Sequence, residues 1–159
     1  MLTCAGCVSG GHPDRELAAG SAFDPTAFFA GRTQGTGVLK VAFRGPELTL
    51  VEGHGRVAAD GTVILDQEVR RGARPATRRT WHLHLDGAGR YSGTLTDATG
   101  PVTGQVEGNR LHLSFAMKGG LHAQQWLDLQ PGGTVARNVM VVSKFGMPLA
   151  RLDETITRK

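Results

Sequence analysis

The sequence predicts an all-β protein, an up-and-down antiparallel β-barrel of about ten strands that follows one short helical turn. Three observations lead to this prediction. Turn-forming residues interrupt the chain at intervals of about 8–14 residues after Thr33, apolar and polar residues alternate between the turns, and the links have the length of hairpins. A sandwich of two sheets is the alternative that this pattern leaves open.

A single folded domain follows from the length of the chain. Its 159 residues suffice for one hydrophobic core, and 40% of them are hydrophobic. The 23 glycines show no collagen-like period and suit a fold with many tight turns. We expect residues 1–22 to be the remnant of a signal peptide followed by a flexible tether, and residues 23–159 to form the barrel domain.

The helical turn is expected just before the first strand, because Asp24 can cap it and Pro25 suits its first position. We expect Phe28 or Phe29 in this turn to lie across one open end of the barrel. The glycines of "FFAGRTQGTG" do not fit a phosphate-binding loop, which needs a strand before its glycines and a helix after them. We expect those at positions 31, 35 and 37 to end the turn and to let the first strand bend where the barrel closes.

The strands are separated by nine turn signals. These are Gly45-Pro46, Asp60-Gly61, Gly72 to Pro75, Asp86 to Gly89, Gly100-Pro101, Gly108-Asn109, Gly119-Gly120, Pro131 to Gly133 and Gly146 to Pro148. Alternation is clear at Trp81, Leu83 and Leu85, the face that we expect in the core, and Leu48 and Leu50 alternate with Thr49. Closing such a sheet removes its edges and leaves room for one small ligand.

Composition argues against a nucleic-acid partner and against a membrane-spanning helix. The 18 Lys and Arg exceed the 14 Asp and Glu by four, but the positive charges are scattered except in "RRGARPATRR", residues 70–79, which we interpret as a solvated hairpin tip. Only 6% of residues are aromatic and no helix is long enough to read a groove, so no nucleic-acid partner is expected. No apolar run reaches the roughly 18 residues of a membrane-spanning helix.

The two cysteines, Cys4 and Cys7, precede every periodic segment. A zinc site would need two further ligands, and His12 alone does not complete one; a thioredoxin-like pair would sit between a strand and a helix. Free or paired thiols on a tail and a bacterial lipoprotein signal remain. Ala5-Gly6-Cys7 fits the signal, although Cys4 stands where a leucine is more usual, so we expect Cys7 to carry a lipid anchor. Because only three residues precede Cys4, we expect the sequence to begin inside its signal peptide.

Catalytic motifs are scarce, and we expect neither an enzyme nor a cofactor. No serine stands in Gly-x-Ser-x-Gly, and Asp66 and Glu68 share a strand face with arginines nearby, which favours an ion pair. The imidazoles of His82 and His84 share a face, but no third metal ligand is nominated, so exposed histidines are expected. A single internal histidine that ligates haem, at position 54 or 112, is a lesser alternative.

Arg79 is the best candidate for a functional residue. It stands two positions before Trp81, so both side chains point to the same face. If that face is inward, the barrel holds a buried cation beside an aromatic wall. Such a charge needs a partner, which is either an internal acid such as Glu68 or the carboxylate or phosphate of a ligand.

Three motifs resemble a known family. "FDPTAFFAGRTQGTG", "RRTWHLHLDGAGRYSGT" and "SKFG" occur in the order found in the bacterial family called domain of unknown function 3833, and the resemblance covers nearly all of residues 23–159. It implies a lipid-anchored envelope protein with a lipocalin-like barrel that accompanies fatty-acid-modifying enzymes, and it implies no established activity. The family's signature positions fall on Phe28, Gly31, Gly37, Arg79, Trp81, Gly93, Trp126, Asn138, Lys144, Phe145 and Gly146. Gln124, Gln125 and Val139 depart from the family pattern, in which charged residues stand there.

These observations combine into one hypothesis. We expect a protein anchored at an envelope membrane, such as the outer membrane, and facing the periplasm, whose barrel binds a lipid or fatty-acyl ligand. The expected ligand-binding residues are Arg79, Trp81, Arg56, Trp126, Asn138 and Lys144, with the polar head at one of the three cations. The alternatives are an accessory envelope protein with a packed barrel, and a haem-binding barrel or cofactor-independent isomerase.

Overall fold

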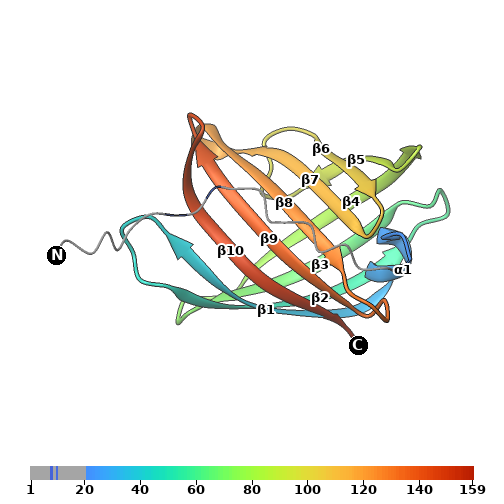
Figure 1. The fold of residues 1–159 in the computed structure, drawn as a ribbon, viewed down its shortest axis with the longest axis horizontal. Helices are drawn as coiled ribbons and strands as arrows, with labels where there is room; N and C mark the ends of the chain where they lie inside the picture. The colour runs from blue at the N-terminus through green and yellow to red at the C-terminus, as the bar shows by residue number, and fades with distance from the viewer. Residues whose placement is uncertain (1–7, 9, 11–20) are drawn as a thin grey trace.

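The computed structural model describes residues 8, 10 and 21–159, and it shows a closed barrel of ten antiparallel strands (Figure 1). The strands are β1 (Gly31–Val41), β2 (Glu47–Val57), β3 (Val63–Arg71), β4 (Thr77–Gly87), β5 (Arg90–Leu95), β6 (Val102–Glu107), β7 (Arg110–Met117), β8 (Leu121–Leu129), β9 (Val135–Lys144) and β10 (Met147–Arg158). Each strand pairs with the next one along the chain, and β1 closes the barrel against β10. The up-and-down prediction is confirmed, and the sandwich is excluded.

One end of the barrel is covered by the helix α1 (Pro25–Phe29), as expected. Asp24 caps it, because its Oδ1 accepts hydrogen bonds from the backbone N–H groups of Thr26 and Ala27 at 2.9 and 3.2 Å. Phe28 and Phe29 are buried in the barrel's hydrophobic core together with Phe23. We call this end, with the loops at 58–62, 88–89, 108–109 and 130–134, the closed end.

The opposite end carries the loops at 42–46, 72–76, 96–101 and 145–146 and the 3₁₀ turn η1 (Lys118–Gly120), and we call it the far end. Among the described residues, α1 is the only α-helix, so no α-helix covers the far end. Figure 1 shows the two hairpin tips β1–β2 and β9–β10 there, on the side of the barrel away from α1. None of the described helices has the length and apolar character needed to cross a bilayer.

Apolar inward-facing side chains fill the barrel next to α1 and, along β5 to β8, as far as the loop at 96–101 of the far end. Trp81 packs edge-on against Phe115, with ring centroids 5.6 Å apart. Other members of this core are Val63, Leu65, Leu83, Tyr91, Leu95, Val102, Leu111, Leu113, Ala123, Leu127, Leu129, Ala136 and Ile156. Leu85, which was expected to join Trp81 and Leu83, is 50% exposed near the end of β4, where the barrel wall stops.

The alternation in β2 has the phase opposite to the one that its residue types suggest. Thr49 is buried and faces inward with Val51, whereas Leu48 is 74% exposed on the outer face. The period of two is therefore right, and the polar residue points into the barrel. Thr49 thus adds a polar group to the barrel interior near the far end.

Candidate functional site

Polar side chains gather inside the barrel beside the hydrophobic core. Gln67, Arg79, Gln125, Asn138 and Glu154 form this interior polar cluster, one from each of β3, β4, β8, β9 and β10. Each stands two positions from a buried core residue on its own strand, so strand alternation directs its side chain inward. The cluster thus joins residues that are up to 87 positions apart, from 67 to 154.

Arg79 and Trp81 share one acceptor in this cluster. The Nε of Arg79 donates to Gln67 Oε1 at 2.8 Å, and the Nε1 of Trp81 donates to the same oxygen at 2.9 Å. The guanidinium carbon lies 5.7 Å from the centroid of the Trp81 ring, within range of a cation–π contact. Gln67 therefore fixes the arginine and the tryptophan against each other. The sequence held a signal for Gln67, since it is the polar residue between the inward-facing Leu65 and Val69.

The charge of Arg79 has no carboxylate partner among the described residues. Glu68, the internal acid that the sequence suggested, lies on the outer face, where its carboxylate oxygens are 2.7 Å from Arg70 Nη2 and 3.7 Å from Arg78 Nη2. An internal ion pair with Glu68 is therefore wrong, because successive residues on a strand face opposite sides. Burial holds the pKa of Arg79 below its ordinary value, while the charge of Glu154 acts in the opposite direction.

Glu154 is the acid that approaches this region from the other side of the barrel. It is 8% exposed, and its Oε2 accepts a hydrogen bond from Asn138 Nδ2 at 2.7 Å. Burial raises the pKa of the Glu154 carboxyl, while the Asn138 hydrogen bond and the charge of Arg79 lower it by less. Glu154 was not among the expected site residues, although its place between the apolar Leu152 and Ile156 indicates an inward side chain.

Gly35 and Gly37 make room for this carboxyl group. Gly37 pairs directly with Glu154 across the β1–β10 seam, and a Cβ there would lie 2.9 Å from the Glu154 Cα. A Cβ on Gly35 would collide with Glu154 Oε1. The sequence suggested that these glycines let the strand bend, and the structure gives them a further role, which is to leave space for an inward side chain on the neighbouring strand.

Several acceptor oxygens in this part of the interior are buried without a donor from the described protein residues. They are Glu154 Oε1, Asn138 Oδ1, Gln125 Oε1 and Thr49 Oγ1. Buried polar groups in folded proteins are nearly always hydrogen-bonded to protein, water or ligand. The interior therefore offers one cation and several acceptors to a guest molecule with polar groups.

Three residues expected at the ligand lie elsewhere. Arg56 is on the outer face, 2.9 Å from Asp66, and Trp126 is buried on the outer face of β8, stacked on His112 at 5.1 Å. Both positions alternate out of phase with the inward-facing residues of their strands. Lys144 is at the far end, with its Nζ 5.6 Å from the Phe145 ring centroid. Of the expected residues, Arg79 and Trp81 lie together inside the barrel, and Asn138 points inward from β9 to contact Glu154.

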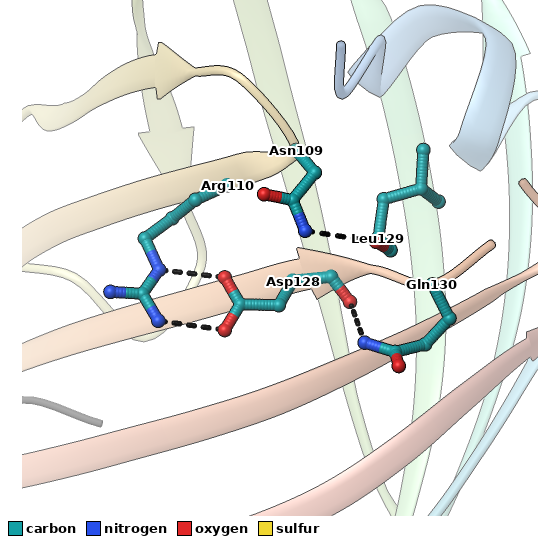
Figure 2. Close-up of polar contacts among 5 residues, drawn as sticks. All are labelled: Asn109, Arg110, Asp128, Leu129 and Gln130. Atoms are coloured by element: carbon teal, nitrogen blue, oxygen red, sulfur yellow. Dashed lines mark hydrogen bonds and ion pairs between the residues drawn. The ribbon is translucent and has the colours of Figure 1, made fainter. Parts of the chain in front are cut away.

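The outer face next to Trp126 carries a well-formed ion pair (Figure 2). Arg110 Nε and Nη2 donate to the two oxygens of Asp128 at 2.6 and 2.7 Å, and both side chains are nearly buried, at 11% and 10% exposure. Asn109 Nδ2 donates to the Leu129 carbonyl at 3.1 Å, and Gln130 Nε2 to that of Asp128 at 2.9 Å. These contacts tie β7 to β8 and the loop that follows, and give this part of the wall a structural role.

The histidines of the described residues all lie on the outer face. His82, His84, His112 and His122 contact the polar side chains of Thr94, Thr62, Gln124 and Ser114 at 3.0–3.3 Å, and His54 is exposed opposite Asp66. Within residues 8, 10 and 21–159, no three potential ligands come together at a metal site. An internal haem ligand at His54 or His112 is therefore wrong. Cys4, Cys7 and His12 lie outside the described residues.

Comparison with solved structures supports the fold. The S-type phycobiliprotein lyase CPES from Guillardia theta matches with a TM-score of 0.67 at 7% identity, over 84% of this chain and 90% of that one. A protein of unknown function of the DUF3598 family from Nostoc punctiforme PCC 73102 matches with a TM-score of 0.63 at 12% identity, over 87% of this chain and 50% of that one. At such identities the likeness concerns the fold, a lipocalin-like barrel.

Comparison with curated proteins gave no match. The family model for proteins of unknown function DUF3833 matches residues 1–158. The chain therefore belongs to the DUF3833 family.

Proposed function

We propose that this protein is a lipid-anchored component of the bacterial cell envelope, facing the periplasm, and that its barrel binds a lipid or fatty-acyl ligand with an anionic head at Arg79. The observation that carries the proposal is a half-buried guanidinium inside the barrel, fixed by Gln67 and Trp81, that forms no ion pair with a described carboxylate. A carboxylate or phosphate would supply the missing partner and receive charge-assisted hydrogen bonds.

Apolar side chains lie on the inner wall between this proposed head-group site and the far end. Between the interior polar cluster and the far end, the inward positions of four strands carry Leu39, Val69, Met140 and Leu152. In the other direction the core around Trp81 fills the barrel. The ligand would therefore enter head first from the far end and leave its chain among these apolar residues.

Glu154 and Asn138 define a second requirement. Their buried oxygens without donors suit a head group that also carries a hydroxyl or amine, such as that of a glycerol- or amine-containing lipid. A simple fatty acid would satisfy Arg79 alone. The relative affinity for a plain and a hydroxylated anionic head therefore reports whether both sides of the site are used.

A binding experiment tests the proposal. Wild-type protein, Arg79→Ala and Arg78→Ala are titrated with oleate and with oleyl alcohol, and complexes are quantified by native mass spectrometry. Arg78 is the matched control, since it is adjacent, carries the same charge and has a side chain 86% exposed on the outer face. Loss of a charged hydrogen-bond partner costs about 1.5–3 kcal/mol, so Arg79→Ala should bind oleate about 10–100-fold more weakly.

The same variants should differ little toward oleyl alcohol, whose head carries no charge. If folded Arg79→Ala binds oleate as the wild type does, the assigned head-group site is wrong. The barrel is an accessory structure with a packed interior if folded wild-type protein binds neither compound and no lipid co-purifies with it from bacterial membranes.

A further inference from the structure

Large apolar side chains are exposed at the far end. Phe43 is 96% exposed, Phe145 88% and Met147 63%. Together with Leu48 they are four of the six large hydrophobic residues exposed among the described residues, and the other two, Val57 and Leu85, are at the closed end. A concentration of this kind on one rim marks an interaction surface.

The backbone at both phenylalanines is in the left-handed region. Phe43 has φ 62° and Phe145 φ 50°, a conformation that favours glycine and is rare for a bulky residue. Neither the backbone nor burial accounts for an aromatic side chain at these two positions. Strained residues of this kind cluster at functional surfaces, and the repetition of the same feature on two hairpins strengthens the inference.

The two hairpin tips are neighbours in space. Val41 pairs with Ala150 across the β1–β10 seam, and the N–H of Ala42 donates to the Leu149 carbonyl at 2.8 Å. Figure 1 shows both tips beyond the barrel wall on the side away from α1. Phe43 and Phe145 thus project from one rim.

Basic residues outnumber acidic ones at this end of the barrel. The loops of the far end and the residues that flank them carry Arg44, Arg71, Arg74, Lys118 and Lys144, against the two acids Glu47 and Asp97, so this rim has five positive and two negative charges. Glu47 is neutralised by Arg74 at 2.7 Å. Aromatic tips within a cationic rim match the surface of an anionic bilayer, where rings enter the interface and basic residues meet lipid phosphates.

We propose that the far end docks on an anionic lipid bilayer, with Phe43 and Phe145 inserted at the interface and the basic rim on the head groups. Two separate protruding tips suit a deformable bilayer better than a rigid protein face, which would need a complementary recess for each ring. The inference goes beyond the proposed function, because it depends only on exposed residues of the rim and on no anchor or interior ligand.

A described residue ahead of the barrel also lies at this end. Gly10 is next to Pro148, at the start of β10, since a Cβ on Gly10 would lie 2.8 Å from the Pro148 Cγ. Cys7 precedes Gly10 by three positions in the sequence. The proposed anchor and the docking rim would therefore act on the same membrane.

Vesicle sedimentation tests the docking. The full chain carries Cys7→Ser, which removes any contribution of an acyl group. It is mixed with phosphatidylcholine vesicles that contain about 30% phosphatidylglycerol, and separately with pure phosphatidylcholine vesicles. We expect binding to the anionic vesicles that weakens with salt. Phe43→Gly/Phe145→Gly should bind at least about tenfold more weakly, because two inserted rings are lost.

The matched control is Val57→Gly/Leu85→Gly, which removes two exposed apolar side chains from the closed end and should bind as the parent chain does. Circular dichroism confirms that each variant is folded. The proposal is overturned if the parent chain ignores anionic vesicles, or if the phenylalanine variant binds them equally well. Phe-dependent self-association on gel filtration without vesicle binding would also overturn it and would identify the rim as a contact between copies of this chain.

Discussion

Glu154 of β10 lies directly opposite Gly37 of β1, at the seam that closes the barrel, and its carboxyl group occupies space that a side chain on β1 would otherwise fill. The interior polar cluster therefore requires glycine at positions 35 and 37 of β1 as well as polar residues on the other strands.

Gly35→Ala should destabilise the protein by about 1–3 kcal/mol, because the new methyl group would displace the Glu154 carboxyl and its hydrogen bond to Asn138. Urea denaturation measures this change. Gly45→Ala is the control, since a Cβ there meets open space, and it should stay within about 0.5 kcal/mol of the wild type. Equal stability of the two variants would contradict the space-filling role assigned to Glu154.

Glu154 should make the stability of the barrel depend on pH. Burial raises the pKa of its carboxyl, so the folded state holds the proton over a pH range in which the unfolded state has lost it. The free energy of unfolding should then fall as pH rises from the ordinary carboxyl pKa through the raised value. Thermal unfolding between about pH 4 and pH 8 should show a shallower slope for Glu154→Gln. Parallel curves for the two proteins would refute the assignment.

The Arg110–Asp128 pair should contribute far more than the exposed pairs. Asp128→Ala leaves a nearly buried guanidinium without its bidentate partner, and we expect a loss of about 3–5 kcal/mol in the free energy of unfolding. Asp66→Ala breaks the exposed pair with Arg56 and should cost less than about 1 kcal/mol. Chemical denaturation of both variants distinguishes the two environments, and similar losses would count against the structural role of the outer-face pair.

Phe43→Gly should leave the folded protein as stable as the wild type or raise its free energy of unfolding by up to about 1 kcal/mol. Glycine adopts the positive φ of this position without strain, and the exposed ring contributes no packing. Phe28→Ala, in the core at the closed end, should instead cost about 3–5 kcal/mol. A large loss from Phe43→Gly would mean that this ring packs within the protein.

Cys7→Ser should leave a membrane association that a high-salt wash removes, since the proposed acyl anchor is lost and the rim contacts that remain are weakened by salt. Cys4→Ser changes the neighbouring thiol and should remain membrane-bound. Fractionation followed by mass spectrometry of the N-terminus measures both outcomes. An unmodified Cys7 in native protein would remove the anchor from the proposed function.

Much of the fold could be predicted because local signals suffice for it. Turn residues delimit the strands, and hairpin-length links make sequential strands neighbours. The facing of individual residues was harder. Thr49 points inward and Trp126 lies on the outer face although it is buried, since burial there depends on what covers the wall and not on the period of the strand.

Part of the site could likewise be predicted from strand periodicity, and part of it could not. Arg79 and Trp81 could be placed together because they are two positions apart on one strand. Their meeting with Gln67, and the approach of Glu154 from β10, depend on the register across the sheet and on the curvature of the barrel. A single sequence contains no direct signal for either. Only the alternation of Leu152, Glu154 and Ile156 indicated that an acid would point inward.

The β1–β10 seam also has a consequence for when the chain can fold. Thr33 pairs with Arg158, so residues 125 positions apart must meet before the barrel closes (158 minus 33). Contacts of such long range make folding slow, and closure has to wait until the last strand is available. During synthesis, which runs from the N-terminus to the C-terminus, the barrel cannot close before β10 is available. Until then the chain remains incompletely folded.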